Sequence, residues 1–277
     1  MDGAATSTLG MTALVYGLTH AAQTSWGDPV TIASFAAGAA LLAAFVSIER
    51  TAAQPITPLR LFANRERTGA YVARMLLVGA MFSMFFFLTQ YLQQVDGFSP
   101  LEAGVAFLPL TLVMFSMVFV VPRLTARFGS ERLLAAGITT ALIGMAWLSQ
   151  VSAGTPYLTG IALPMIILGV GAGAAFTPLT SSGVAGVEPA DAGAASGLVN
   201  VAHQLGGSLG LGVLVTVFAS AAPADGLAHA ISSSLTAGAV MLALALGVTL
   251  ALIRRPPSAE AGVVELPTVA YDEELAA

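Results

Sequence analysis

Polar side chains recur on one side of a long apolar segment in the last third of the chain. Asn200, His203 and Gln204 follow Ser196 and precede Gly207 at spacings of three and four residues. That spacing places them along one face of an α-helix. Polar groups within a bilayer turn toward a bundle interior or a wet cavity, where they also hydrogen-bond between helices. Asn200, His203 and Gln204 are therefore candidates for lining a substrate path, with helix packing as the alternative.

Two side chains within apolar segments carry or can acquire a positive charge. Arg74 lies inside the segment 69–93, where a charge is costly and suggests function. The alternative is that its long side chain extends to the nearby membrane surface or pins the helix in place. His203 titrates near neutral pH when water reaches it, so a role in proton movement is a hypothesis.

A second polar set stands at the end of the segment 69–93. Gln90 and Gln94 are four residues apart and share a helical face, next to Tyr91. One interpretation is that they line the outer mouth of a substrate path. The other is an interfacial polar end with an aromatic anchor.

Glycines occur in pairs four residues apart. Small residues at this spacing let two helices approach closely in a bilayer, so we expect these pairs to pack against neighbouring helices. No strand or acidic partner supports a dinucleotide-binding loop at the first pair. The pairs are Gly169 and Gly173, Gly193 and Gly197, and Gly206 and Gly210.

The chain offers no constellation for catalysis or metal binding. It has no cysteine, and its three histidines are scattered. Sequence motifs of zinc proteases, serine hydrolases and nucleotide-binding loops are missing, as is a basic patch with interleaved aromatics. We expect no enzyme activity, no cofactor, no metal and no nucleic-acid partner.

The composition indicates a protein that is embedded in a lipid bilayer. Of 277 residues, 56% are hydrophobic and only 9% are charged, against about 25% charged in soluble domains. About 20 apolar residues are needed to span the hydrocarbon core as a helix. The expected fold class is an all-α polytopic membrane protein with eight transmembrane helices. They lie near 4–22, 30–48, 69–93, 103–122, 132–151, 157–180, 194–220 and 229–253.

Arginine positions predict the orientation of these spans. The basic clusters alternate with loops that carry acids and no arginine, and basic loops are cytoplasmic. Both termini should therefore be cytoplasmic, in the plasma membrane. Only the turn around Glu188 and Asp191 lacks its expected basic residue. The clusters are Arg50, Arg60, Arg65 and Arg67; Arg123, Arg127 and Arg132; and Arg254 and Arg255.

The connecting segments divide the chain into four parts. Residues 1–50 form a pair of helices, and 69–255 form six. Between them, 51–68 holds prolines, arginines and apolar residues, which fits a connector lying in the cytoplasmic headgroup layer. The polar, acidic segment 256–277 is expected to be a disordered cytoplasmic tail.

Several stretches of sequence are shared with a known family. They are Ala103–Pro109, Pro122–Gly129, Gly169–Gly173, Ala192–Gly210 and, in support, Pro58–Phe62 and Leu9–Gly17. Together they resemble the C-terminal portion of the fourteen-helix drug:proton antiporters of the major facilitator superfamily. The resemblance implies the six-helix C-terminal half of that fold, preceded by the helix pair that these proteins insert between their halves.

The resemblance also implies a function and a second motif. Arg123, Arg127, Gly129 and Arg132 resemble the second copy of the family's cytoplasmic-loop motif, with Ala126 where the first copy keeps an aspartate. A full member has six further helices, which carry its main coupling motifs. We therefore expect a module of a proton-coupled multidrug exporter, incomplete without an N-terminal half. Its substrates would be lipophilic or cationic small molecules.

Two other functions stay open. The chain would instead be a non-transporting scaffold or regulatory subunit that docks on another membrane protein, or an inactive product of a truncated gene. A neighbouring reading frame for six helices, and a transport assay on the chain alone, would separate these possibilities.

Overall fold

The computed structural model describes residues 2–52 and 55–253, apart from the side chains of residues 2 and 222–225. The elements in these ranges are helices. The long helices are α1 (Asp2–Gln23), α2 (Pro29–Thr51), α3 (Arg65–Gln90), α5 (Leu108–Phe128), α6 (Ser130–Leu148), α7 (Leu163–Val184), α8 (Ala192–Asp225) and α9 (Leu227–Leu252). Short elements are α4 (Pro100–Ala106), the 3-10 turns η1 (Leu59–Ala63) and η4 (Pro189–Asp191), and the π turns η2 (Tyr91–Val95) and η3 (Tyr157–Ala162).

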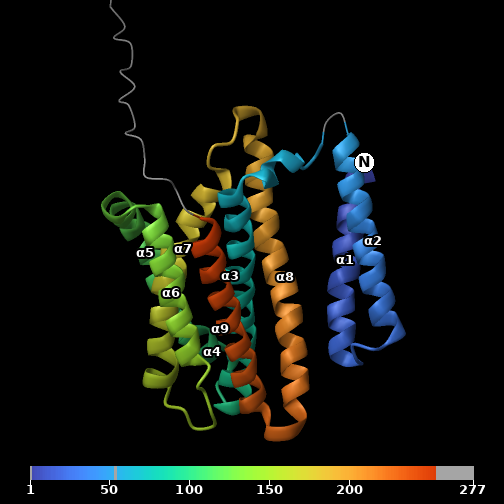
Figure 1. The fold of residues 1–277 in the computed structure, drawn as a ribbon. Coiled ribbons are helices and arrows are strands. Elements are labelled where there is room, and N and C mark those ends of the chain that lie inside the picture. Colours follow the sequence, from blue (N-terminus) through green and yellow to red (C-terminus); the bar gives the residue numbers. More distant parts are fainter. Residues whose placement is uncertain (1, 53–54, 254–277) are drawn as a thin grey trace, which may run out of the picture.

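The predicted fold class, an all-α polytopic membrane protein, is confirmed. Among the described residues, seven helical stretches are long and apolar enough to cross a membrane. The predicted first span is α1, a helix of 22 residues, which is not one of the seven. Its threonines and serine lower its apolar character, and it lies alongside α2 in the structure (Figure 1).

Residue types that favour caps and turns begin and end the helices. Asp28 caps α2 by accepting hydrogen bonds from the backbone of Val30 and Thr31. Ser99 and Glu102 form a reciprocal capping box at the start of α4. Gly129 ends α5 at φ +83° and ψ 156°, a backbone region that is essentially restricted to glycine.

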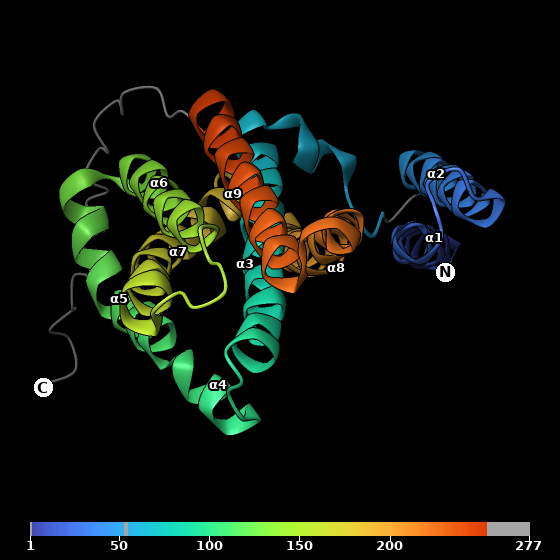
Figure 2. The same ribbon diagram turned by 90° about the horizontal axis from the view of Figure 1, so that it is seen from below.

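The helices form a six-span bundle with the α1–α2 pair beside it (Figures 1 and 2). Within the bundle, α3 packs on α8 and α9, α7 packs on α5 and α6, and α3 and α7 touch each other. The pair is attached through α1, which packs against α8. Side chains such as Leu77, Met84, Phe87, Leu134 and Ile138 are fully buried between these helices.

Two of the three glycine pairs lie where a neighbouring helix packs so closely that a side chain larger than hydrogen would collide with it. A Cβ on Gly206 would collide with the backbone of Met75, and one on Gly210 with the Cα of Gly79, so α8 and α3 touch backbone to backbone. On α7, a Cβ on Gly169 would come within 2.9 Å of the Leu110 carbonyl oxygen on α5. Gly173 likewise faces α5, where a Cβ would lie 2.7 Å from the side chain of Met117.

The third pair differs from the expectation of helix packing. A Cβ on Gly193 or Gly197 would meet nothing within 4 Å among the described residues. Both glycines are exposed in the first turns of α8, so no neighbouring helix of this chain requires a small residue there.

The turn between α7 and α8 receives arginines from distant parts of the chain. Arg60 in η1 donates from Nε and Nη2 to the two carboxylate oxygens of Asp191, at 2.9 and 2.8 Å. The buried Arg67 donates to the carbonyl of Ala185 at 2.9 Å. The basic residues that the sequence of this turn lacks are therefore supplied by the connector and the first turn of α3.

We expect the glycine contact between α3 and α8 to be sensitive to a single methyl group. Gly210→Ala should lower the free energy of unfolding by about 1–3 kcal/mol, because the added Cβ overfills a packed contact. Thermal unfolding of the purified chain in detergent measures the change. Gly197→Ala on the same helix is the matched control, and it should be neutral or stabilising by up to about 1 kcal/mol because alanine favours helix. Equal effects of the two substitutions would contradict the packing assignment.

The Arg60–Asp191 pair should show a modest coupling energy. Asp191 is nearly buried, but the Arg60 side chain is 65% exposed, so solvent screening limits the interaction to about 0.5–1 kcal/mol. A double-mutant cycle with Arg60→Ala and Asp191→Ala, read by thermal unfolding, measures it. The same cycle with Glu188→Ala, an exposed acid of the same turn, should give no coupling. Additive effects of Arg60→Ala and Asp191→Ala would show that the pair contributes nothing.

Candidate functional site

The polar face of α8 meets side chains of α3 and α7 in a mixed polar and aromatic cluster. Arg74 donates from Nη1 to the hydroxyl of Thr180 at 2.8 Å, and its guanidinium carbon lies 5.4 Å from the centre of the Phe176 ring. The His203 ring stands edge-on to Phe82 and tilted to Phe176, with ring centres 6.0 and 6.1 Å apart. We call Arg74, Phe82, Phe176, Thr180 and His203 the Arg74 cluster.

Backbone geometry places Arg74 and Thr180 toward the arginine-rich end of the bundle, since Thr180 is four residues before the end of α7 at Val184. Arg74 follows the start of α3 at Arg65 by nine residues, which is about 13 Å along a helix. Phe176 and Thr180 are four apart on α7, so they share a face. Thr180 also donates to the carbonyl of Phe176 at 2.9 Å, which leaves its oxygen oriented to accept from Arg74.

Two nitrogen atoms of the cluster are shielded from solvent but have no hydrogen-bond partner among the described residues. They are Nε of Arg74 and Nδ1 of His203. The ion pairs found in that part of the chain join Arg60 to Asp191 and His20 to Asp28, so neither neutralises Arg74. An unsatisfied buried polar group costs about 1–3 kcal/mol, and more when it is charged.

The remaining substrate-path candidates divide into two groups. Asn200 and Gln204 are exposed on α8 beside the half-buried His203, so these three residues do share one surface. Gln90 and Gln94 lie at the other end of α3 and in η2. Sixteen residues separate Gln90 from Arg74, about 24 Å along the helix. Near that far end, burial raises the pKa of the Asp96 carboxyl above its ordinary value.

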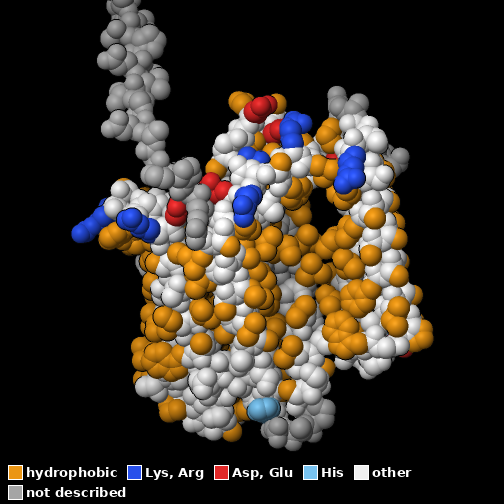
Figure 3. Space-filling model, viewed as in Figure 1, with side chains coloured by type: hydrophobic (Ala, Val, Ile, Leu, Met, Phe, Trp, Pro, Cys, Tyr) orange, Lys and Arg blue, Asp and Glu red, His pale blue; other side chains and the backbone are white. Residues whose placement is uncertain are grey.

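The arginines of the loop motif are exposed around the turn from α5 to α6. Arg123 donates to the carbonyl of Phe119 at 2.9 Å, and the guanidinium of Arg127 lies 5.2 Å from the Phe128 ring centre. Gly129 forms the turn, and Arg132 follows it in α6, also exposed. Basic side chains gather at one end of the molecule, the upper end in Figure 3. Arg254, Arg255 and the predicted tail 256–277 lie outside the described residues.

Sequence reasoning singled out Arg74 and His203 but did not predict that Phe176 and Thr180 of α7 lie beside them. The spacing of Phe176 and Thr180 indicates one helical face, but nothing local shows which helix that face meets. The structure shows that Arg74 joins two helices. Its guanidinium bonds to Thr180, four residues before the end of α7 at Val184, and lies over Phe176, a contact that pins α3 to α7.

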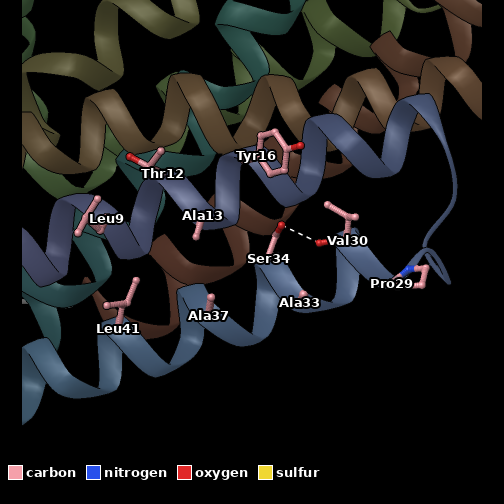
Figure 4. Close-up of a pocket in the computed structure, with 10 residues that line it drawn as sticks. All are labelled: Leu9, Thr12, Ala13, Tyr16, Pro29, Val30, Ala33, Ser34, Ala37 and Leu41. Atoms are coloured by element: carbon pink, nitrogen blue, oxygen red, sulfur yellow. Dashed lines mark hydrogen bonds between the residues drawn. The ribbon is translucent and has the colours of Figure 1, made fainter.

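A shallow groove between α1 and α2 has no comparable chemistry. It has a volume of about 660 Å³ and is lined by residues such as Leu9, Tyr16 and Leu41 (Figure 4). The Ser34 hydroxyl in its wall donates to the carbonyl of Val30 at 2.7 Å. The Thr12 hydroxyl donates within α1 to the carbonyl of Thr8 at 2.8 Å. Both hydroxyl protons are already engaged with helix backbone, so the groove presents a largely apolar wall.

Carboxylates are kept out of the middle of the helices. In the described part of the chain, every Asp and Glu lies in a turn or within the terminal turns of a helix. No group of three or more His, Asp and Glu in that part is arranged to hold a metal ion. The Arg74 cluster and the exposed Asn200 and Gln204 are therefore the polar features of the membrane interior that suggest a binding role.

Comparison with known proteins identifies relatives of the whole chain. A family model described as Major Facilitator Superfamily matches residues 3–211. The cephamycin export protein CmcT of Amycolatopsis lactamdurans is 36% identical over 277 residues, which cover 98% of this chain and 56% of that protein. The puromycin resistance protein pur8 of Streptomyces alboniger is 35% identical over 250 residues, covering 87% and 50%. The lincomycin resistance protein of Streptomyces lincolnensis is 33% identical over 217 residues, covering 78% and 45%. The chain spans about half the length of the curated relatives it matches.

Proposed function

The chain belongs to the Major Facilitator Superfamily, and we propose that it is the C-terminal part of a fourteen-helix, proton-coupled multidrug exporter. It is a multi-pass membrane protein whose relatives are named as antibiotic export and resistance proteins. In this proposal, 69–255 is one transporter half and 1–50 is the inserted helix pair. The segment 51–68 is the connector at the cytoplasmic surface, and 256–277 is a cytoplasmic tail.

One observation carries the proposal: polar side chains of a membrane-spanning helix are exposed beside exposed aromatic surface. Asn200 and Gln204 are exposed on α8, and Phe82 of α3, whose ring centre lies 6.0 Å from that of His203, is 46% exposed. Apolar side chains suit lipid, but polar ones within a span face protein or a wet cavity. A second transporter half with a substrate path between the halves would satisfy both kinds of side chain.

The internal arrangement of the bundle agrees with this proposal. Transporters of this superfamily contain three-helix inverted repeats, and their substrate site lies near the midplane between two halves that rock against each other. Here the repeats would be 69–151 and 157–253, which begin with α3 and α7. These two helices touch each other at the Arg74 cluster. The substrate would be a lipophilic small molecule held against the exposed aromatic side chains.

Proton coupling should depend mainly on the other half. In the described residues, carboxylates lie at helix ends and in turns. In these positions a carboxylate remains ionised, so it is not a carrier of protons within the membrane. His203 is the histidine of this bundle that lies away from the helix ends. We propose that the complementary half supplies the buried acid and that this chain supplies one wall of the path.

We further propose that the arginine-rich end faces the cytoplasm of the cell and that both termini lie there. The gathering of basic side chains at one end supports this, because basic loops stay on the cytoplasmic side. The sequence contains no cysteine, so single cysteines report on their own positions without background.

Cysteine labelling in intact cells tests that orientation. Gly27→Cys and Ala153→Cys, in turns at the far end, should react with a membrane-impermeant maleimide added outside. Ala126→Cys and Ala190→Cys, exposed at the arginine-rich end, should react only after the cells are permeabilised. Labelling of Ala126→Cys in intact cells would reverse the proposed orientation.

Efflux assays test whether the chain is one half of an exporter. The purified chain alone in energised vesicles should not move a lipophilic dye against its gradient, because one half has no opposing wall. Fusing it to the portion of the cephamycin export protein that it does not match should produce efflux that stops when the proton gradient is collapsed.

Two results would contradict the proposal. Gradient-dependent efflux by the chain alone would show that it is a complete transporter. A fusion that folds and binds dye but never moves it would favour a scaffold, a regulatory subunit or an inactive product.

A further inference from the structure

A second groove lies between α1 and α8, and its lining differs from that of the groove between α1 and α2. It has a volume of about 640 Å³, within the range of about 300–1,000 Å³ that is usual for small-molecule pockets. We call it the α1–α8 groove. Apolar side chains such as Val15, Val201 and Leu205 line it, and none of its lining residues is charged. Six lining residues carry a hydroxyl group, and they are Ser7, Thr8, Thr12, Tyr16 and Thr19 of α1 and Ser208 of α8.

The hydroxyl groups are accessible from the groove. Thr12 and Tyr16 are four residues apart, so they share a face of α1, and both are exposed. Ser208 is exposed on the facing side of α8. One turn beyond Ser208 the two helices come together, because a Cβ on Gly212 would lie 3.2 Å from the side chain of Leu18. The two helices thus form an accessible groove that ends where they meet.

Four of the hydroxyl groups already donate their protons. Those of Ser7, Thr12, Thr19 and Ser208 donate to backbone carbonyls of their own helices at 2.8–3.0 Å. A hydroxyl oxygen that donates its proton keeps lone pairs that accept hydrogen bonds. These four oxygens therefore remain available as acceptors within an otherwise apolar lining.

This lining determines which kind of molecule fits. The acyl chain of a lipid has no hydrogen-bond donor, so it would leave the hydroxyl oxygens without a partner. A charged molecule would find no opposite charge in the lining, and removing an unpaired charge from water is costly. An uncharged molecule with an apolar body and N–H or O–H groups satisfies both the apolar side chains and the oxygens.

The α1–α8 groove adjoins the surface that we propose for the substrate path. Val201 and Leu205 line the groove, and they directly follow the exposed Asn200 and Gln204 along α8. The two surfaces therefore meet on this helix, so a molecule can pass from the groove to the path.

We infer that the α1–α8 groove binds an uncharged lipophilic molecule that carries N–H or O–H groups. The helix pair α1–α2 then has a function of its own, because α1 supplies one wall of the site and most of its hydroxyl oxygens. This inference rests on the proposed function and deepens it. It names the substrate class of this groove and makes the groove a lateral entrance to the path between the halves.

Two matched probes test the inference on the full chain. They are 1-pyrenemethanol and its methyl ether, which share an apolar body and differ in the hydroxyl donor. Binding to the purified chain is measured by equilibrium dialysis, both in detergent and in phosphatidylcholine nanodiscs, with the signal of protein-free samples subtracted. The alcohol should bind about two- to tenfold more tightly than the ether, which is the range expected for one neutral hydrogen bond.

Variants of the lining locate the site. The double variant with Thr12→Val and Thr19→Val removes two acceptor oxygens and keeps the side-chain shape. It should lower the affinity for the alcohol about two- to tenfold and leave the affinity for the ether unchanged. Ser208→Leu fills the groove and should weaken binding of both probes. Ser34→Ala, which removes a hydroxyl of the α1–α2 groove, is the control and should change neither affinity. Thermal unfolding verifies that each variant is folded.

Cysteine protection measures the position of the bound probe independently. The sequence contains no cysteine, so Val201→Cys in the α1–α8 groove and Ala37→Cys in the α1–α2 groove each introduce a single thiol. Saturating 1-pyrenemethanol should slow the reaction of Val201→Cys with N-ethylmaleimide severalfold and leave that of Ala37→Cys unaffected.

Several outcomes would overturn the inference. Equal affinity of the wild type for alcohol and ether would show that the oxygens do not recognise a donor, and equal protection of the two thiols would show that the probe does not select this groove. Binding that is present in detergent and absent in nanodiscs would assign the groove to bilayer lipid. Loss of binding on fusion to the complementary half would show that this half covers the same side of α8. Because binding is measured on the chain alone and efflux on the fusion, failure here is distinguishable from failure of the exporter proposal.

Discussion

The contact between α3 and α8 is the packing feature on which the candidate site depends. Gly206 and Gly210 allow the backbone of α8 to reach Met75 and Gly79 of α3. Any larger side chain at these glycines would push the helices apart. Their close approach places His203 against Phe82, and the packing of α7 on both helices places Phe176 between His203 and Arg74. Close packing of α3, α7 and α8 thus brings together the residues of the Arg74 cluster, which come from all three helices.

The cost of charge in hydrocarbon explains where the other ionised groups lie. Asp28, Glu102 and the acids of the turns lie at helix ends, where they cap backbone or meet water. Arg67 is buried, but its guanidinium donates hydrogen bonds to the carbonyls of Leu61 and Ala185. Arg74 lies further along α3 and has one hydrogen-bond acceptor among the described residues, the Thr180 hydroxyl. An arginine within a span is a default sign of function.

Sequence periodicity predicted which residues share a helical face, but it did not predict which helices meet. Asn200, His203 and Gln204 share a face because a helix repeats every 3.6 residues, and the structure places them on one surface. The same periodicity paired Gln90 with Gln94, but the length of α3 puts them about 24 Å from Arg74. The motif of two glycines four apart predicted close packing equally for all three pairs. Only the presence or absence of a crossing helix separates Gly210 from Gly197.

Hydrophobic length and arginine spacing were sufficient to predict a helical membrane protein, seven of its eight expected spans and the end at which its basic side chains gather. These properties follow from local physics, because each helix must satisfy its own backbone hydrogen bonds in lipid and each charge must reach a polar layer. The partners of Arg74, the arginines that serve the α7–α8 turn and the open side of Gly197 could not be predicted in this way. They depend on which helices cross and at what height, which is set by side-chain packing between segments more than a hundred residues apart.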